Sequence, residues 1–173
     1  MFSKKGWSIP AASILFIFFG VSTAYAEDHP QCYTVASLRG SYAVVATYGA
    51  NVAVALAKRY LDGDGNLTGT FLVNAPTVGS TTGARTLITG TQVGTYTVNC
   101  DGTGVFVRTL TATNGIVSHQ IDDFVITKAK RTEGDQLIAT AIQDIQRTPS
   151  TLVPGGIMVT RAYTRVPDQS PMP

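Results

Sequence analysis

Histidine and cysteine are scarce in this chain, and their scarcity excludes several classes of enzyme. The sequence contains two histidines, His29 and His119, and two cysteines, Cys32 and Cys100. A zinc enzyme is not expected, because the sequence lacks a cluster of Cys and His ligands. The Gly-x-Ser-x-Gly turn of serine hydrolases is absent, and the glycine-rich turns lack the following helix that a phosphate cradle requires. The sequence therefore predicts no metal, no cofactor and no nucleophile motif.

An excess of charge of one sign is also missing. The chain has 13 Lys and Arg against 11 Asp and Glu, and Lys4 and Lys5 belong to a segment that we expect to be removed. Without these two lysines, the basic and acidic residues balance and the formal net charge is zero. A nucleic-acid partner is therefore not expected, because phosphate binding requires a basic surface.

Long apolar runs are absent as well. The longest is Ala11–Gly20, whereas a helix that spans a membrane needs about 20 apolar residues. This run follows Lys4 and Lys5 and precedes Ala24-Tyr25-Ala26, which fits the small-x-small rule for signal cleavage. We predict a signal peptide over residues 1–26. A membrane anchor is the alternative, which the shortness of the run disfavours.

The remaining residues, 27–173, suit a single domain with one core that is periplasmic or secreted, without a stable membrane anchor. Two cysteines in an exported chain favour a disulfide between Cys32 and Cys100 over a metal site. Such a bond would tie the start of the domain to its centre. Two unpaired thiols are the alternative.

Short alternating runs separated by turn sequences predict an antiparallel sheet. In Gly94–Gly104, Thr95, Thr97 and Asn99 alternate with Tyr96, Val98 and Cys100 before an Asp-Gly turn. The run Asn51–Leu61 is rich in alanine and has a helix as its alternative. A helical turn is expected over Val35–Arg39. The predicted strands are Ser41–Tyr48, Asn51–Leu61, Gly69–Asn74, Arg85–Gly90, Gly94–Asn99, Thr103–Thr113, Ile116–Lys128, Leu137–Gln146 and Ile157–Val166.

Strands joined in this way indicate an all-β fold, and the sequential hairpins favour an antiparallel up-and-down β-barrel of about eight strands. A β-sandwich is the alternative. Closure of a barrel removes exposed strand edges, and the interior of an eight-stranded barrel is filled by side chains or holds one small ligand.

Asp62-Gly63-Asp64-Gly65-Asn66 matches the opening of a calcium-binding EF-hand loop. The match ends there, because Leu67 and Val73 stand where the loop needs its glycine and its bidentate glutamate. We interpret this segment as a turn between strands.

Three segments carry a resemblance to a known group of proteins. They are Leu38–Tyr42 (Leu-Arg-Gly-Ser-Tyr), Asp62–Thr70 and Gly94–Gly104. Together they resemble small exported bacterial β-barrel proteins, which are similar in architecture to lipocalin-like and allene oxide cyclase-like barrels. The resemblance implies the fold alone, because its motifs are turn sequences and no catalytic residue of a cyclase matches this chain position by position.

One segment, Ile116–Lys128, places polar residues within a strand. Alternation puts His119 and Asp123 on one face and Asp122 on the other, so one aspartate must point into a closed barrel. An inward carboxylate needs a partner, and Arg108, Arg161 and Arg165 are the cations available. Such a pair could bind a ligand or act as an acid and base. Aspartates on the solvent face, or an ordinary ion pair, are the favoured alternative.

Arg161, Tyr163 and Arg165 share one face of the last predicted strand. This face either lines the cavity, where it would suit an anionic or aromatic ligand, or lies outside. We expect the exterior position. The candidate ligand-binding residues are therefore Arg108, His119, Asp122, Asp123, Arg161 and Tyr163.

Three functions fit these observations. The first is binding of a small, partly apolar or aromatic ligand without turnover. The second is a cofactor-free cyclase or isomerase that uses Asp122 or Asp123, Arg108 and Tyr163. The third is a structural or envelope-interaction protein with a filled barrel. A cavity within the barrel would favour the first two functions, and a packed interior would favour the third.

Overall fold

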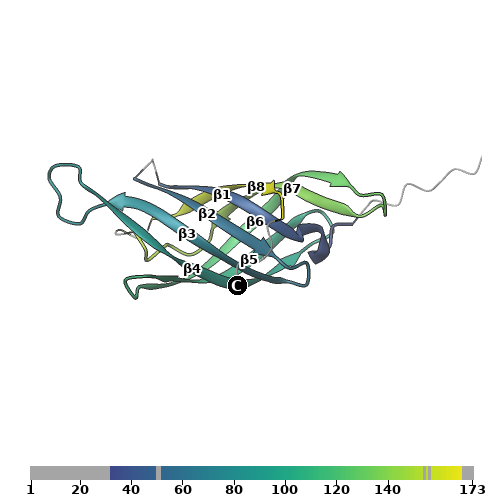
Figure 1. Cartoon of the computed structure of the whole chain (residues 1–173), viewed down its shortest axis with the longest axis horizontal. Helices are drawn as coiled ribbons and strands as arrows, with labels where there is room; N and C mark the ends of the chain where they lie inside the picture. Colours follow the sequence, from purple (N-terminus) through teal and green to yellow (C-terminus); the bar gives the residue numbers. More distant parts are fainter. Residues whose placement is uncertain (1–31, 50–51, 154, 156, 169–173) are drawn as a thin grey trace, which may run out of the picture.

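The chain forms a closed barrel of eight antiparallel strands (Figure 1), which confirms the predicted all-β barrel. The computed structural model describes residues 32–49, 52–153, 155 and 157–168, and the predicted signal peptide, residues 1–26, lies outside them. Each strand pairs with the next, and β8 pairs with β1 to close the barrel. The strands are β1 (Gly40–Tyr48), β2 (Ala53–Leu61), β3 (Asn66–Pro76), β4 (Arg85–Val98), β5 (Thr103–Ala112), β6 (Val117–Arg131), β7 (Leu137–Gln146) and β8 (Val159–Val166).

The two strands predicted on either side of Gly90 and Gly94 are one continuous strand, β4. The glycines do not break it. A Cβ at Gly90 or Gly94 would overlap the backbone of β5, at Thr111 and Val107 respectively. Glycine is therefore found here because the neighbouring strand approaches closely, and the sheet runs on through both positions.

The inward side chains form two apolar clusters with a polar layer between them. One cluster includes Tyr42, Leu61, Phe106 and Phe124. The other includes Tyr48, Phe71, Val73, Leu110 and Val159. The polar layer, called the ionic layer below, consists of Arg59, Gln92, Arg108, Gln120, Asp122, Asp144, Gln146, Arg161 and Tyr163.

A covering segment packs onto each cluster. The expected helical turn is present as the 3₁₀ helix η1 (Val35–Leu38), whose Leu38 is fully buried in the first cluster. Figure 1 shows η1 at one end of the barrel. Leu152 and Val153, in the connection between β7 and β8, are buried in the second cluster. Side chains from outside the sheet thus complete the packing of both clusters.

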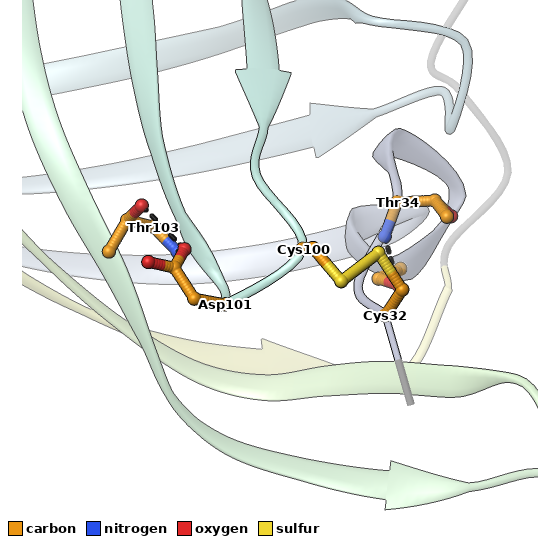
Figure 2. The surroundings of a disulfide bond; sticks show 6 residues. Cys32, Thr34, Cys100, Asp101 and Thr103 are labelled. Carbon is orange, nitrogen blue, oxygen red and sulfur yellow. Dashed lines mark hydrogen bonds between the residues drawn. A yellow bond between two sulfur atoms is a disulfide. The ribbon is translucent and has the colours of Figure 1, made fainter. Parts of the chain in front are cut away.

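A disulfide holds η1 against the turn between β4 and β5 (Figure 2). Cys32 and Cys100 are bonded, with their Cα atoms 4.3 Å apart. The backbone N–H of Tyr33 also donates to the carbonyl of Cys100 at 3.1 Å. The adjoining turn is fixed by Asp101, whose Oδ1 accepts from the N–H of Thr103 at 3.0 Å. The predicted link between the start of the domain and its centre is present.

The Asp62 segment is a turn, as expected. Both carboxylate oxygens of Asp62 are occupied by its own loop. Oδ1 accepts from the backbone N–H of Asp64 at 2.7 Å and of Asn66 at 2.9 Å, and Oδ2 accepts from the Asn66 amide at 2.7 Å. These bonds are those of an Asx-type turn, which gives the aspartate a structural role.

Candidate functional site

The alternation of β6 places Asp122 inside the barrel and Asp123 outside it, which confirms the predicted split between the two aspartates. Asp122 is fully buried, and its side chain lies between two arginines. Arg108 donates through Nε to Oδ2 at 2.7 Å, and Arg161 donates through Nη1 to Oδ1 at 2.8 Å. Each carboxylate oxygen of Asp122 therefore has its own guanidinium partner.

The expected exterior position of the Arg161 face is wrong. Arg161 and Tyr163 point into the barrel, where they are 6% and 1% exposed. The outward positions of β8 are Thr160, Ala162 and Thr164. The physical reason is that β7 supplies a second buried carboxylate, Asp144, whose Oδ1 accepts from Arg161 Nη1 at 3.0 Å. With two carboxylates inside, a buried guanidinium is compensated.

Arg165, the third residue of that face, lies at the end of the strand. Its guanidinium lies 5.9 Å from the centre of the Tyr42 ring and donates to the carbonyl of Arg39. It contacts the covering segment near η1 and makes no ion pair with Asp122 or Asp144 among the bonds described for those carboxylates.

Arg59 and Asp144 belong to this site, and the sequence analysis missed them. Arg59 donates through Nη1 to the hydroxyl of Tyr163, and that hydroxyl donates to Asp144. The signal was available for Arg59, because Ala53, Ala55 and Ala57 share one face of their strand and Arg59 continues the same alternation. Ile142, Asp144 and Gln146 likewise alternate inward along β7.

Three glutamines complete the ionic layer. Gln92 Oε1 accepts from Arg59 Nε and Arg108 Nη1, each at 3.0 Å. Gln120 Oε1 accepts from Arg108 Nη2 at 2.8 Å and Arg161 Nη2 at 3.0 Å. Gln146 Oε1 accepts from Arg161 Nη2 at 3.4 Å, while its Nε2 is buried without a hydrogen-bond partner in the described structure. The glutamine carbonyls thus serve as additional acceptors for the arginines.

Burial and charge shift the pKa values of the layer in opposite directions. Burial favours the neutral form of Asp122, but Arg108, Arg161 and Arg59 outweigh it and hold the pKa of this carboxyl below its usual range. Burial, together with the repulsion from Arg59 and Arg161, lowers the pKa of Arg108 to about 10. Burial also raises the pKa of the Tyr163 hydroxyl above its usual value. At neutral pH, Asp122 is therefore ionised, Arg108 is charged and Tyr163 is protonated.

The remaining two candidate residues lie on the outer face. His119 Nδ1 is 3.1 Å from the hydroxyl of Thr109 on the neighbouring strand. Asp123 forms an exposed ion pair with Arg147, whose Nε lies 3.0 Å from Oδ2. The structure therefore brings Arg108, Asp122, Arg161 and Tyr163 together inside the barrel and separates His119 and Asp123 from them.

A small cavity lies inside the barrel beside the ionic layer. Its volume is about 20 Å³, and its lining includes Arg59, Arg108 and Arg161. Sites for organic ligands typically have volumes of about 300–1,000 Å³. The polar groups of the ionic layer thus bond directly to one another, and the cavity beside them has room for about one water molecule.

Several aliphatic side chains are exposed on the outer face. Val45, Leu56 and Ile145 are 57%, 59% and 60% exposed. Register places Ala162 opposite Val45, Val45 opposite Leu56 and Leu56 opposite Leu72. Ala162, Val45, Leu56 and Leu72, called the apolar row below, therefore form an unbroken line across β8, β1, β2 and β3.

A groove of about 550 Å³ overlaps this row at Val45 and Ala162. Thr160 and Ala162 are short, while Val45 and Ile145 rise from the strands on either side, which leaves the hollow. Its outward lining also includes Thr47, Asp123, Val125 and Gln143. We call this feature the outer groove.

The described residues contain no group of three or more His, Cys, Asp or Glu side chains that could hold a metal ion. Within the same residues, no helix has the length and apolar character needed to cross a membrane. Comparison with protein-family models, with curated proteins and with solved structures finds no significant match to this chain.

Proposed function

We propose that this protein is an exported, non-catalytic barrel that functions by association of its outer face with a second copy of the chain. The observation that carries the proposal is the contrast between the two sides of the wall. Inside, the charged groups bond to one another beside a cavity of about 20 Å³. Outside, the apolar row is exposed on four adjacent strands.

The interior offers little for the two functions that need a cavity. A substrate for a cyclase or isomerase would have to reach Asp122, Arg108 and Tyr163. Asp122 is saturated by two guanidinium groups, and Tyr163 is held between Arg59 and Asp144. Freeing any of these groups would leave a buried charge without its partner, which costs several kcal/mol.

The chemistry of the outer face fits a second copy. On β8, β1, β2 and β3, the outward side chains described include a single charge, Lys58. Depletion of charge is typical of the core of protein interfaces. A two-fold interface brings a patch against itself, so an uncharged aliphatic patch is self-complementary, whereas a patch of one charge sign is repulsive. The balanced charge of the chain without its leader adds no long-range repulsion between copies.

Closure of the barrel determines how a partner docks. In the closed part of the barrel every strand has two neighbours, so strand addition finds no edge there. One-sided extensions include residues 85–89 of β4 and residues 137–139 of β7. A partner that docks on the apolar row therefore contacts side chains of the outer face. Val45 and Leu56 protrude from the outer face, and the outer groove is recessed. The side chains of a second copy can pack against these two residues and into the groove.

Binding of a small, partly apolar molecule in the outer groove is a second candidate function. The observation that favours it is the volume of about 550 Å³, which lies in the range of small-molecule sites. Val45, Val125 and Ile145 supply apolar contacts, and Asp123 and Gln143 supply polar ones.

The test uses the exported protein, purified with its disulfide intact, and measures its mass in solution by light scattering and sedimentation. We expect a dimer or higher oligomer that dissociates in Val45→Lys. Val107→Lys is the matched control, because Val107 is also an exposed strand valine, at 50%, on β5 away from the apolar row. We expect this control to leave the assembly intact.

A wild-type monomer at micromolar concentration would overturn the proposal. A monomer that carries a small molecule in native mass spectrometry, and loses it in Val45→Lys, would establish the second candidate. Equal dissociation by both lysine variants would show that the apolar row is not the interface.

A further inference from the structure

The charges of the ionic layer do not balance. The buried charged residues of the described structure are Arg59, Arg108, Arg161, Asp122 and Asp144. Three guanidinium groups thus face two carboxylates, which leaves one positive charge in excess inside the barrel. An uncompensated charge in a dry interior is strongly unfavourable, so a compensating group is expected.

No further residue of the described structure supplies the missing negative charge. Guanidinium groups do not lose their protons in proteins under ordinary conditions. The Tyr163 hydroxyl donates to Asp144, and burial raises its pKa, so it stays neutral. The outer carboxylate Asp123 is paired with Arg147 on the other side of the wall.

The ionic layer also contains a buried hydrogen-bond donor without an acceptor. Gln146 is 3% exposed, and its Nε2 lacks a partner in the described structure. Gln146 does not line the interior cavity, so the excess of positive charge is the observation that points to that cavity.

The interior cavity lies next to the three arginines that carry the excess positive charge. All three arginines of the layer line it, together with Gln92 and Tyr48. Its remaining lining is apolar and includes Phe71 and Leu110 of the second cluster and Val44 of the first. Its volume of about 20 Å³ exceeds the roughly 10–15 Å³ that one water needs and is far below the roughly 300–1,000 Å³ of organic-ligand sites.

We propose that this cavity binds one monatomic anion of about the size of chloride, held by Arg59, Arg108 and Arg161. The anion balances the charge of the ionic layer. Because side chains cover both clusters, the ion enters during folding or when an end of the barrel opens. It acts as a structural ion that links β2, β5 and β8.

The test compares the thermal stability of the exported, disulfide-bonded protein in sodium chloride and sodium gluconate at equal ionic strength, after refolding without chloride. Gluconate is too large for the cavity. A ligand that binds only the folded state raises Tm with its concentration. We expect Tm to rise by several degrees as chloride replaces gluconate, and to rise similarly with bromide.

Arg59→Met removes the excess charge and should abolish the difference between chloride and gluconate. Arg147→Met changes the net charge equally, but Arg147 is an exposed arginine outside the cavity, so this control should keep the difference. If Arg59→Met does not fold, crystals of the wild-type protein grown in bromide provide the second measurement. We expect an anomalous peak within contact of the three guanidinium groups.

Equal Tm values in the two salts, together with no bromide peak in the cavity, would overturn the proposal. A tyrosinate absorption band at neutral pH would also overturn it, because an ionised Tyr163 would then balance the charge. These outcomes do not depend on self-association, which is measured separately by solution mass.

Discussion

Asp122 and Asp123 are consecutive residues of β6 on opposite sides of the barrel wall: the Asp122 side chain is 0% exposed and the Asp123 side chain 43%. Each is paired with arginine, Asp122 with Arg108 and Arg161, and Asp123 with Arg147. The same type of interaction therefore occurs in two environments one residue apart. Substitutions at these two aspartates therefore compare how much a buried and an exposed carboxylate contribute to the free energy of unfolding.

We expect Asp122→Asn to destabilise the protein far more than Asp123→Asn. Loss of the Asp122 charge leaves three buried arginines with one carboxylate, and breaking a buried pair in this way costs about 3–5 kcal/mol. An exposed pair is worth at most about 1 kcal/mol. Urea unfolding followed by circular dichroism measures both free energies of unfolding. Equal losses in the two variants would contradict the structure of the ionic layer.

Stability should depend on pH through Asp122. Its pKa in the folded protein is held below its usual value, which is about 3.9 in an unfolded chain. The ionised carboxylate therefore stabilises the fold fully above that value, and the contribution is lost as pH falls through the folded pKa. We expect the free energy of unfolding to change little between about pH 7 and 5 and to fall below about pH 4. Asp123→Asn should show the same acid dependence of stability as the wild type. If this acid dependence disappeared in Asp123→Asn, it would belong to the surface pair of Asp123 and Arg147.

Local sequence patterns were sufficient to predict most of the architecture. Alternation and turn sequences located the hairpins, such as the one in which Asn114-Gly115 lies between β5 and β6. Such signals depend on neighbouring residues, so one sequence contains them in full. Gly90 and Gly94 misled the prediction of β4, because a glycine that permits close strand packing looks the same in sequence as one that ends a strand.

The candidate site was only partly predictable, because its partners come from distant strands. Asp122 needed a cation, and the sequence could not show that Arg161 faced inward until Asp144 was known to lie beside it. The usual rule that apolar residues point inward also fails locally. In β7, Asp144 is buried while Ile145 is 60% exposed. Only the closed register decides which alternating set faces the interior.

Removal of the disulfide should lower stability without changing the barrel. Cys32 and Cys100 are separated by 68 residues, and closing a loop of this length stabilises the folded state by about 4 kcal/mol in the chain-entropy model. We expect Cys32→Ser/Cys100→Ser to lose a large part of this amount and to keep the far-ultraviolet spectrum of a barrel. Reduction of the wild type should have the same effect on urea unfolding. A stability that does not change on reduction would show that the bond contributes little.

Gly104 tests how tightly the interior is packed against β5. A Cβ at this position would overlap the ring of Phe124 and the carbonyl of Thr97, although the backbone of Gly104 is not in the left-handed region. Gly104→Ala should therefore destabilise the protein by about 1–3 kcal/mol through overpacking. Gly134→Ala is the matched control, because the nearest atom to its Cβ, Thr132 Oγ1, lies 3.9 Å away. We expect this exposed turn substitution to change stability by at most about 0.5 kcal/mol. Since Phe124 belongs to the cluster that η1 covers, tolerance of alanine at position 104 would mean that this ring can move and that this half of the interior is not close-packed.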